Sequence, residues 1–520
     1  MPIYLSILFL ILTPVIMLIV RLVRPGFVYH WLLAVGGAGI AWLMVLLAGL
    51  QFPRTLELVA WKPEILFTSS PFLIVDRFSW PFAAGIATLL LAVILTDVAR
   101  PAEVDWSSWA GELSLAGLGL FAILAGNPLT LVLAWTAIDL LELTILLGEV
   151  KEAGATREVV IRFSIRLVGS FLLIAAGLSS EDTGAGLSFS VTSPRAILLF
   201  LAAGGLRLGV FPLHFPFRQR QGIRLGLDIL TLLIPAASTL VLLTRSASAM
   251  EISGLTAQFS SLLMFMVGCA AVLAATAWCV GVDAFEGRQV WVLATASLAL
   301  AATLRAQPEA SLAWGLAVIF AGGLLLLATV RNRWISWFMM VGVAGFSALP
   351  LTPTWGGADL FTAPFSPLLL LYWIAHILLL MGYARHALRL SGSFAGLERW
   401  VILIYPLGLG LLALVYFLVG WRIRPQTGGL PLALWLEGLL ALIVAGLALY
   451  WTRRHDRLLH KARAIVEPIF SLDWLYLLVG FFYQLLDRIV GFITLILEGE
   501  GGILWVLLWT VLVLLLLARS

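Results

Sequence analysis

The stretch PLTLVLAWTAIDLLELTILL, residues 128–147, is an apolar run of about 20 residues that carries only two charges. Coiled as an α-helix, a run of this length matches the hydrocarbon thickness of a bilayer. Similar runs recur along the 520-residue chain, which is 62% hydrophobic and only 12% charged, against about 25% charged residues in average soluble proteins. These features predict an all-α polytopic membrane protein without a sizeable soluble domain.

The hydropathy pattern predicts about fifteen spans. Each must be helical, because backbone groups find no water partners inside the hydrocarbon. They cover residues 3–20, 27–50, 72–95, 111–126, 128–147, 158–178, 195–213, 225–244, 258–282, 289–304, 310–330, 334–350, 365–383, 400–420 and 431–451.

The C-terminal part of the chain has a different pattern. A dense basic stretch lies at 453–463, and an apolar segment interrupted by carboxylates follows at 473–498. This segment either spans the membrane or lies flat along it or along a partner. A last span is predicted at about 502–518.

Lysine and arginine are more frequent in the loops that follow odd-numbered spans. Examples are Arg100, Arg288 and the group at 218–224, whereas the loops near Asn127 and between 181 and 194 have none. The positive-inside rule therefore predicts that the N-terminus lies outside. We expect a multi-pass protein of a bacterial inner membrane.

Two predicted spans contain proline-rich interruptions. One reads LRLGVFPLH at 206–214 and the other GFSALPLTPTWGG at 345–357. Proline removes a backbone donor and clashes with the preceding turn, so we expect broken helices near Pro212 and Pro350. Broken helices at corresponding places of two halves are typical of transporter-type repeats. An ordinary proline kink or the end of a span is the alternative.

Charged side chains inside predicted spans suggest a functional site, because burying a charge in the membrane is costly. Asp139 and Glu142 are three residues apart and therefore share one helix face. Two carboxylates this close resist ionising together, so one tends to hold a proton, as a proton relay requires. The alternative is that they are structural partners of buried arginines.

The next two spans supply cations that could face these carboxylates. Arg162 and Arg166 lie one turn apart in the sixth span, and Arg207 lies in the seventh. We expect Asp139 to be a counter-ion of these arginines, which stay charged under almost all conditions. His214 follows Arg207 by seven residues and could shuttle protons near neutral pH, or it could cap the broken helix. His376 has no partner that the sequence reveals.

Other chemistry is not indicated by the sequence. It contains no phosphate-binding loop, dinucleotide fingerprint, zinc spacing or cysteine cluster, so we expect no cofactor in this chain. The two cysteines, Cys269 and Cys279, lie in one apolar stretch where core packing explains them. No lysine-rich run suggests nucleic acid.

Several motifs, in order, resemble the antiporter-like membrane subunits of respiratory complex I, membrane-bound hydrogenases and multi-subunit Na+/H+ antiporters. The similarity runs from about residue 72 to about 360. RLGVFPLHF at 207–215 is similar to the family's Lys-x-x-x-x-Pro-x-His-x-Trp, and DLLEL at 139–143 is similar to its Glu-Leu-x-Ser-Leu. The remaining similar stretches are VDRFSWPF at 75–82, TREVVIRF at 156–163, the segment 283–297 and ALPLTPTWGG at 348–357.

The resemblance implies about fourteen core helices in two inverted five-helix repeats, followed by extra C-terminal helices. It suggests domains at 1–110, 111–250, 258–420 and 421–520. It also implies a hydrated polar axis and proton translocation coupled to a neighbouring redox module. Asp139 would take the place of the family's essential Glu, Arg162 that of the Lys that modulates it, and Arg207 that of the first relay Lys.

This sequence departs from the family at several relay positions. Arg207 replaces a proton-releasing lysine with a fixed cation, and neither 235–239 nor 314–323 carries a lysine or histidine. Asp359 stands about where an exit lysine is expected. The first half thus keeps its charges, and the second half has lost most of them.

Three hypotheses follow. In the first, the chain is a membrane-arm subunit of an NADH:quinone oxidoreductase or related assembly, itself without redox chemistry, with other membrane subunits, the lipid bilayer, and protons or Na+ as partners. In the second, it is a degenerate structural subunit that moves no ions. In the third, it is a stand-alone secondary transporter.

Overall fold

The computed structural model describes residues 2–50, 53–57, 70–100, 105–149, 153–181, 189, 193–211, 213, 224–250, 257–362, 366–392, 394–423 and 432–454, and the single positions 481, 484, 488, 506, 510 and 511. The chain divides into two units, Met1–Val466 and Glu467–Ser520. All helices and strands named below belong to the first unit. The segments predicted at 473–498 and 502–518 lie almost wholly outside the described residues.

Fifteen α-helices make up the described part of the first unit. They are α1 (Pro2–Val23), α2 (His30–Ala48), α3 (Ser79–Asp97), α4 (Trp106–Ile123), α5 (Pro128–Glu149), α6 (Ala153–Glu181), α7 (Pro194–Leu208), α8 (Leu225–Met250), α9 (Ala257–Val280), α10 (Arg288–Leu304), α11 (Pro308–Leu327), α12 (Arg333–Gly345), α13 (Leu369–Ala387), α14 (Arg399–Arg422) and α15 (Leu432–Arg454). Eleven helices in the described residues are long and apolar enough to cross a membrane. The expectation of an all-α polytopic membrane protein is confirmed.

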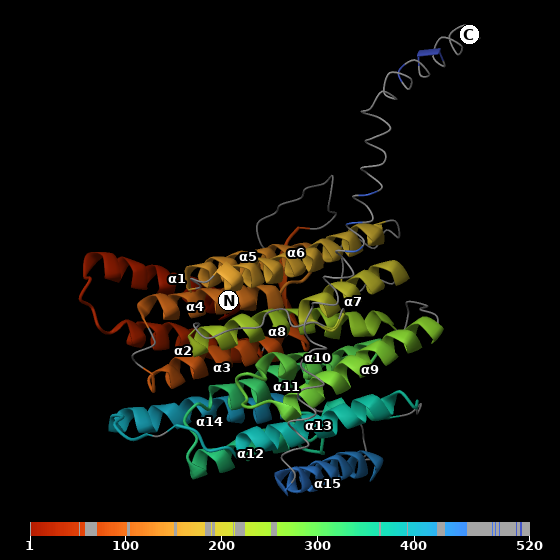
Figure 1. The fold of residues 1–520 in the computed structure, drawn as a ribbon. Helices are drawn as coiled ribbons and strands as arrows, with labels where there is room; N and C mark the ends of the chain where they lie inside the picture. Colours follow the sequence, from red (N-terminus) through yellow and green to blue (C-terminus); the bar gives the residue numbers. More distant parts are fainter. Residues whose placement is uncertain are drawn as a thin grey trace. The chain divides into compact units, whose positions relative to one another are not determined.

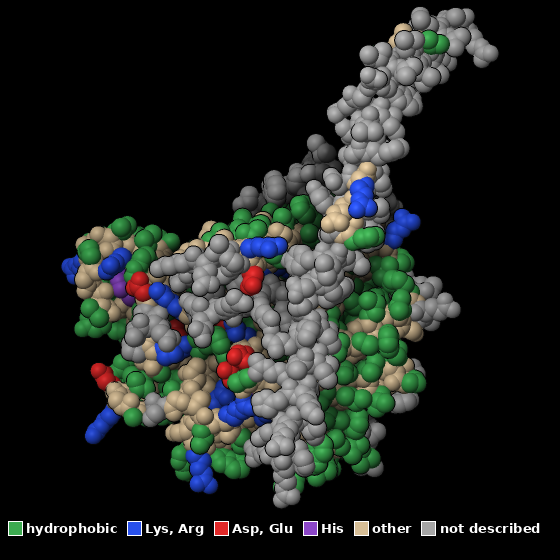
Figure 2. Space-filling view, in the orientation of Figure 1, with side chains coloured by type: hydrophobic (Ala, Val, Ile, Leu, Met, Phe, Trp, Pro, Cys, Tyr) green, Lys and Arg blue, Asp and Glu red, His purple; other side chains and the backbone are tan. Residues whose placement is uncertain are grey.

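The helices run roughly alongside one another, with α8, α10 and α11 between the group α4–α7 and the group α12–α15 (Figure 1). The helices α3, α8 and α11 are buried along their spanning lengths. Large apolar side chains such as Leu22, Trp334 and Leu403 remain exposed. Apolar side chains also cover much of the described surface in Figure 2. A surface of this kind suits contact with lipid rather than water.

Two sets of five helices repeat the same packing pattern. In α4–α8 the first helix packs on the second and fifth, the second on the third and fifth, the third on the fourth, and the fourth on the fifth. The helices α9–α13 make the same six pairings. Because five is odd, a second set that crosses the membrane in succession has the opposite orientation, as expected for an inverted repeat. The helix α14 lies outside both sets, and the domain boundaries suggested by the sequence stay predictions.

Three predicted spans have different boundaries in the structure. The span at 72–95 begins as strand β2 (Phe72–Val75), which pairs antiparallel with β1 (Arg54–Glu57), and α3 starts only at Ser79. Two more spans end early, because α7 stops at Leu208 and α12 stops at Gly345. Residue Gly209, which follows α7, has φ +78°, a left-handed conformation that glycine adopts easily.

The break after α12 is held by side-chain hydrogen bonds. Both Tyr416 and Thr354 donate to the Gly345 carbonyl, and the Ala348 amide donates to the Thr354 hydroxyl. Ala348 has φ +57° and Leu351 φ +71°, an unfavourable region for residues with a side chain. A short 3-10 helix, η1 (Trp355–Phe361), follows before α13. The helix break predicted near Pro350 is therefore observed.

Candidate functional site

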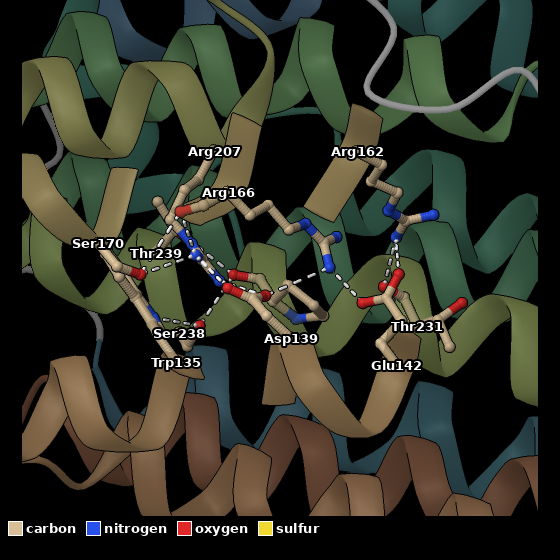
Figure 3. Close-up of polar contacts among 11 residues, drawn as sticks. Trp135, Asp139, Glu142, Arg162, Arg166, Ser170, Arg207, Thr231, Ser238 and Thr239 are labelled. Atoms are coloured by element: carbon tan, nitrogen blue, oxygen red, sulfur yellow. Dashed lines mark hydrogen bonds and ion pairs between the residues drawn. The ribbon is translucent and has the colours of Figure 1, made fainter. Parts of the chain in front are cut away.

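Five of the six predicted site residues lie together on three neighbouring helices. Asp139 and Glu142 come from α5, Arg162 and Arg166 from α6, and Arg207 from α7. The helix α6 packs against both α5 and α7, which brings the two carboxylates and three guanidinium groups onto facing surfaces. Each of the five is at most 5% exposed. Figure 3 shows their side chains meeting between the helices.

Arg207 holds Asp139 with two parallel hydrogen bonds. Its Nη1 donates to Oδ2 at 2.8 Å and its Nη2 donates to Oδ1 at 2.9 Å. This fork geometry is the strongest pairing available to a carboxylate. The same Nη1 also donates to the backbone carbonyl of Arg166 at 3.0 Å and reaches the Ser170 hydroxyl at 3.4 Å. Asp139 is therefore the counter-ion that the sequence analysis expected for this arginine.

An aromatic ring supports the Arg207 guanidinium from one side. The guanidinium carbon lies 4.2 Å from the ring centre of Trp135, one turn before Asp139 on α5. The indole nitrogen of Trp135 donates to the Ser238 hydroxyl of α8 at 2.9 Å. This hydrogen bond fixes the ring in place, so Arg207 is oriented by α5, α6 and α8 together.

Glu142 is shared between two arginines. Arg162 Nη2 lies 2.6 Å from Oε1, and Arg166 Nη1 donates to Oε2. The same Arg166 nitrogen lies 3.6 Å from Asp139 Oδ1. Arg166 therefore stands between the two carboxylates.

A proline in α8 supplies the remaining partner of Arg162. Pro235 has no amide hydrogen, so the carbonyl four residues earlier, that of Thr231, loses its usual helical donor. Arg162 Nη2 donates to this carbonyl at 3.0 Å. The missing helical hydrogen bond in α8 thus provides an acceptor for a charged side chain of α6.

The network holds three guanidinium groups against two carboxylates. Guanidinium groups from α6 and α7 therefore stand on both sides of the two carboxylates of α5. The expectation that one of the pair holds a proton stays a prediction.

His214 and Pro212, the remaining parts of the predicted motif, lie outside the described residues, so the structure gives no position for the His214 side chain. The helix α7 ends four residues before Pro212, with Arg207 in its last turn.

Further buried charges lie on α3, α4, α8 and α10, and most of them were not predicted from the sequence. Asp228 pairs with Arg288 at 2.6 Å, and Asp97 pairs with Arg100 at 3.0 Å. Glu112 is 1% exposed. A charged residue inside an apolar helix was the available signal for Glu112, but its neighbours are set by tertiary packing.

Gly226 permits the close approach of two of these carboxylates. A Cβ atom added to Gly226 would lie 2.8 Å from Glu112 Oε1 and 3.0 Å from Asp97 Oδ1. The buried carboxylates of α3 and α4 therefore approach each other at the start of α8.

Fold and site together define a polytopic all-α membrane protein with two five-helix repeats and a buried charge network in the first repeat. By sequence alone, no family model matches the chain and no characterised protein matches it significantly.

Comparison of structures finds the same fold in multi-subunit membrane complexes. A chain of the membrane-bound sulfane sulfur reductase, an archaeal respiratory membrane complex, is similar with a TM-score of 0.69 and 15% identity, covering 100% of both chains. A chain of the Mrp complex from Dietzia sp. DQ12-45-1b gives 0.71 and 13%, covering 100% of this chain but 63% of that one. A chain of respiratory complex I from Thermus thermophilus gives 0.60 and 17%, covering 80% and 98%. The fold implied by the sequence motifs is confirmed.

Proposed function

We propose that this chain is a membrane-arm subunit of a complex-I-like assembly, an NADH:quinone oxidoreductase or a relative, of the proton-translocating antiporter-like type. The fold is shared with chains of three multi-subunit membrane complexes. The observation that carries the proposal is the network in which Asp139, Glu142 and three arginines meet at most 5% exposed. Membrane proteins retain buried charges of this kind mainly where ions or protons act.

In the proposed mechanism Arg166 couples the two carboxylates. Its Nη1 contacts Glu142 Oε2 and lies 3.6 Å from Asp139 Oδ1. A proton that arrives on Glu142 cancels its charge and weakens its hold on Arg166. The guanidinium then moves towards Asp139, so the protonation of one carboxylate changes the electrostatic environment of the other.

The surroundings follow from the same proposal. Other membrane subunits of the complex would flank the chain, and redox chemistry would occur in those partners without a cofactor here. The transported ion would be a proton or Na+. The membrane would be a bacterial inner membrane, and the distribution of basic loops favours an N-terminus on its outer side.

A structural subunit that moves no ions is the second candidate. The specific observation in its favour is that Arg207 stands where the family has a lysine and grips Asp139 through two hydrogen bonds. Arginine does not release its proton, so this pair by itself acts as a fixed clamp.

Purification from native membranes in mild detergent tests the assembly. The proposal expects the chain to co-purify with other membrane subunits and with redox-active subunits. A chain that is recovered alone, fully folded, from every mild detergent would contradict membership of such an assembly.

Substitution of Asp139 separates the two candidates. In an intact complex, Asp139→Asn should lower the rate of proton uptake by about tenfold or more, which corresponds to a rise of about 1.4 kcal/mol in the activation barrier. Glu398→Gln, an exposed carboxylate that precedes α14, is the matched control and should leave uptake unchanged. Normal uptake in Asp139→Asn with the complex assembled would favour the structural subunit.

A further inference from the structure

A buried histidine lies at the helix break of the second repeat. His376 of α13 is 0% exposed. Three aromatic rings surround it: Trp314 of α11 at 5.0 Å, Phe346 at 5.4 Å and Phe361 of η1 at 6.2 Å between ring centres. The sequence by itself reveals no partner for this residue.

One ring nitrogen of His376 faces the broken end of α12. Nε2 lies 2.9 Å from the carbonyl oxygen of Phe346, the residue that directly follows α12. The last carbonyls of a helix lack helical donors and need partners from elsewhere. Because the helix stops here, a carbonyl is available to accept a hydrogen bond from this imidazole.

The other ring nitrogen faces a carboxylate from a different helix. Nδ1 lies 3.8 Å from Oε1 of Glu437 on α15, whose side chain is 14% exposed. Among the residues that the structure describes, neither Nδ1 nor either oxygen of Glu437 has a hydrogen-bond partner. The two groups face each other as an electrostatic pair at a distance that a small side-chain rotation closes.

Both partners of the imidazole are acceptors. A neutral imidazole carries one N–H and can satisfy only one of them, whereas an imidazolium donates from both nitrogens. A lone buried charge is costly, but the imidazolium opposite an ionised carboxylate is neutral as a pair. The geometry therefore suits a site that holds one proton between His376 and Glu437.

The other helices that pack against α13 offer no comparable charge to this ring. In the described part of the chain, Glu437 is the one carboxylate that forms an ion pair with His376. The remaining titratable or charged residues on α13 and on the elements packed against it are Cys269 and Cys279 on α9, Arg288 on α10, Glu309 on α11, Arg333 on α12, Asp359 on η1, Tyr450, Arg453 and Arg454 on α15, and Tyr372, Tyr383, Arg385 and His386 on α13 itself.

We propose that His376 and Glu437 form a proton-binding site in the second repeat, next to the broken end of α12. At rest the proton is on Nδ1, so that an imidazolium faces an ionised carboxylate. When the proton transfers to Oε1, the N–H bond breaks as an O–H bond forms, and the ion pair becomes a neutral pair. The inference rests on the proposed function, because proton conduction through the chain needs a carrier in the half that has lost its lysines.

Nitrogen NMR of the full-length chain in bilayers, labelled with 15N-histidine, tests the pair directly. The chain has six histidines, and His376→Gln identifies the signal of this one. At neutral pH, His376 should give the doubly protonated signal. In Glu437→Gln it should change to the neutral form protonated at Nε2, with the ratio of charged to neutral imidazole falling by about 10- to 1,000-fold.

Two controls keep the result clear. Glu398→Gln removes an exposed carboxylate and should leave the His376 signal unchanged, and the signal of His386 on the same helix reports whether the fold is intact. A neutral His376 in the unsubstituted chain, or a charged signal that persists in Glu437→Gln while His386 is unchanged, would overturn the inference.

The NMR result is independent of the proposed function. An imidazolium at His376 together with normal proton uptake in Asp139→Asn would support the pair and contradict the function. A neutral His376 together with lost uptake in Asp139→Asn would do the reverse.

Discussion

Replacing Arg207 by methionine should destabilise the protein strongly. Met keeps the length of the side chain but removes both hydrogen bonds to Asp139, at 2.8 and 2.9 Å. Asp139, 4% exposed, is then left with Arg166 at 3.6 Å as its remaining cation. Breaking a buried ion pair by removing one partner costs about 3–5 kcal/mol, and the remaining cation places the expected loss near the lower value, about 3 kcal/mol.

The assay is unfolding of the full-length chain in mixed micelles by titration with dodecyl sulfate, followed by tryptophan fluorescence. Arg195→Met is the matched control, because Arg195 lies on the same helix with an exposed side chain, and its effect should stay within about 0.5 kcal/mol. The double variant Asp139→Leu with Arg207→Met removes both charges. It should lose less than the sum of the single variants by about 0.5–3 kcal/mol.

A loss below about 1 kcal/mol for Arg207→Met, or strict additivity in the double variant, would show that the two side chains are not energetically coupled. The ion pair would then have no part in organising α5 and α7.

Three further outcomes are expected. Gly226→Ala should lower the free energy of unfolding by about 1–3 kcal/mol, because its methyl group would press on the buried Glu112 carboxylate, whereas Gly39→Ala, with open space around it, should not destabilise. Trp135→Phe should lower the free energy of unfolding by about 1 kcal/mol, because the hydrogen bond to Ser238 is lost. Trp135→Leu should lower it by about 1 kcal/mol more, because the cation–π contact with Arg207 is also lost. The same titration measures both variants. Burial, and secondly the charge of Glu309, raise the pKa of the Asp359 carboxyl, so the folded chain binds this proton more tightly and loses stability as pH rises above about 4. Asp359→Asn should therefore raise the melting temperature at pH 7 and have little effect at pH 4; equal melting curves at both pH values would contradict this.

Much of the helical fold could be predicted from the sequence, because bilayer thickness sets the length of each apolar run. The start predicted for the third span, at residue 72, was wrong for a physical reason, because α3 begins only at Ser79. The residues Phe72–Val75 are apolar enough to extend the span, and only their pairing with Arg54–Glu57 makes them a strand. The pairing of Asp139 with Arg207 was predictable, because few charges lie in this part of the membrane.

Other parts of the network could not be predicted. The contact of Arg162 with Thr231 depends on a carbonyl freed by Pro235, 73 positions along the chain from Arg162 and visible only once α6 and α8 are packed. Glu437 approaches His376 because α15 packs on α13. Apolar periodicity places residues on helix faces but does not say which helices become neighbours.

The proline in α8 has a mechanical consequence. Three side chains hold this helix at different points along its length. Arg288 forms an ion pair with Asp228, Arg162 donates to the Thr231 carbonyl, and Trp135 donates to the Ser238 hydroxyl. A proline inside a helix favours bending there, and the Thr231 carbonyl lies one turn before Pro235. Because α10 and α11 pack on α8, a bend of α8 at Pro235 would move this carbonyl and with it the contact of Arg162 with Glu142. A structural change in the second repeat would in this way alter the charge environment of a carboxylate in the first.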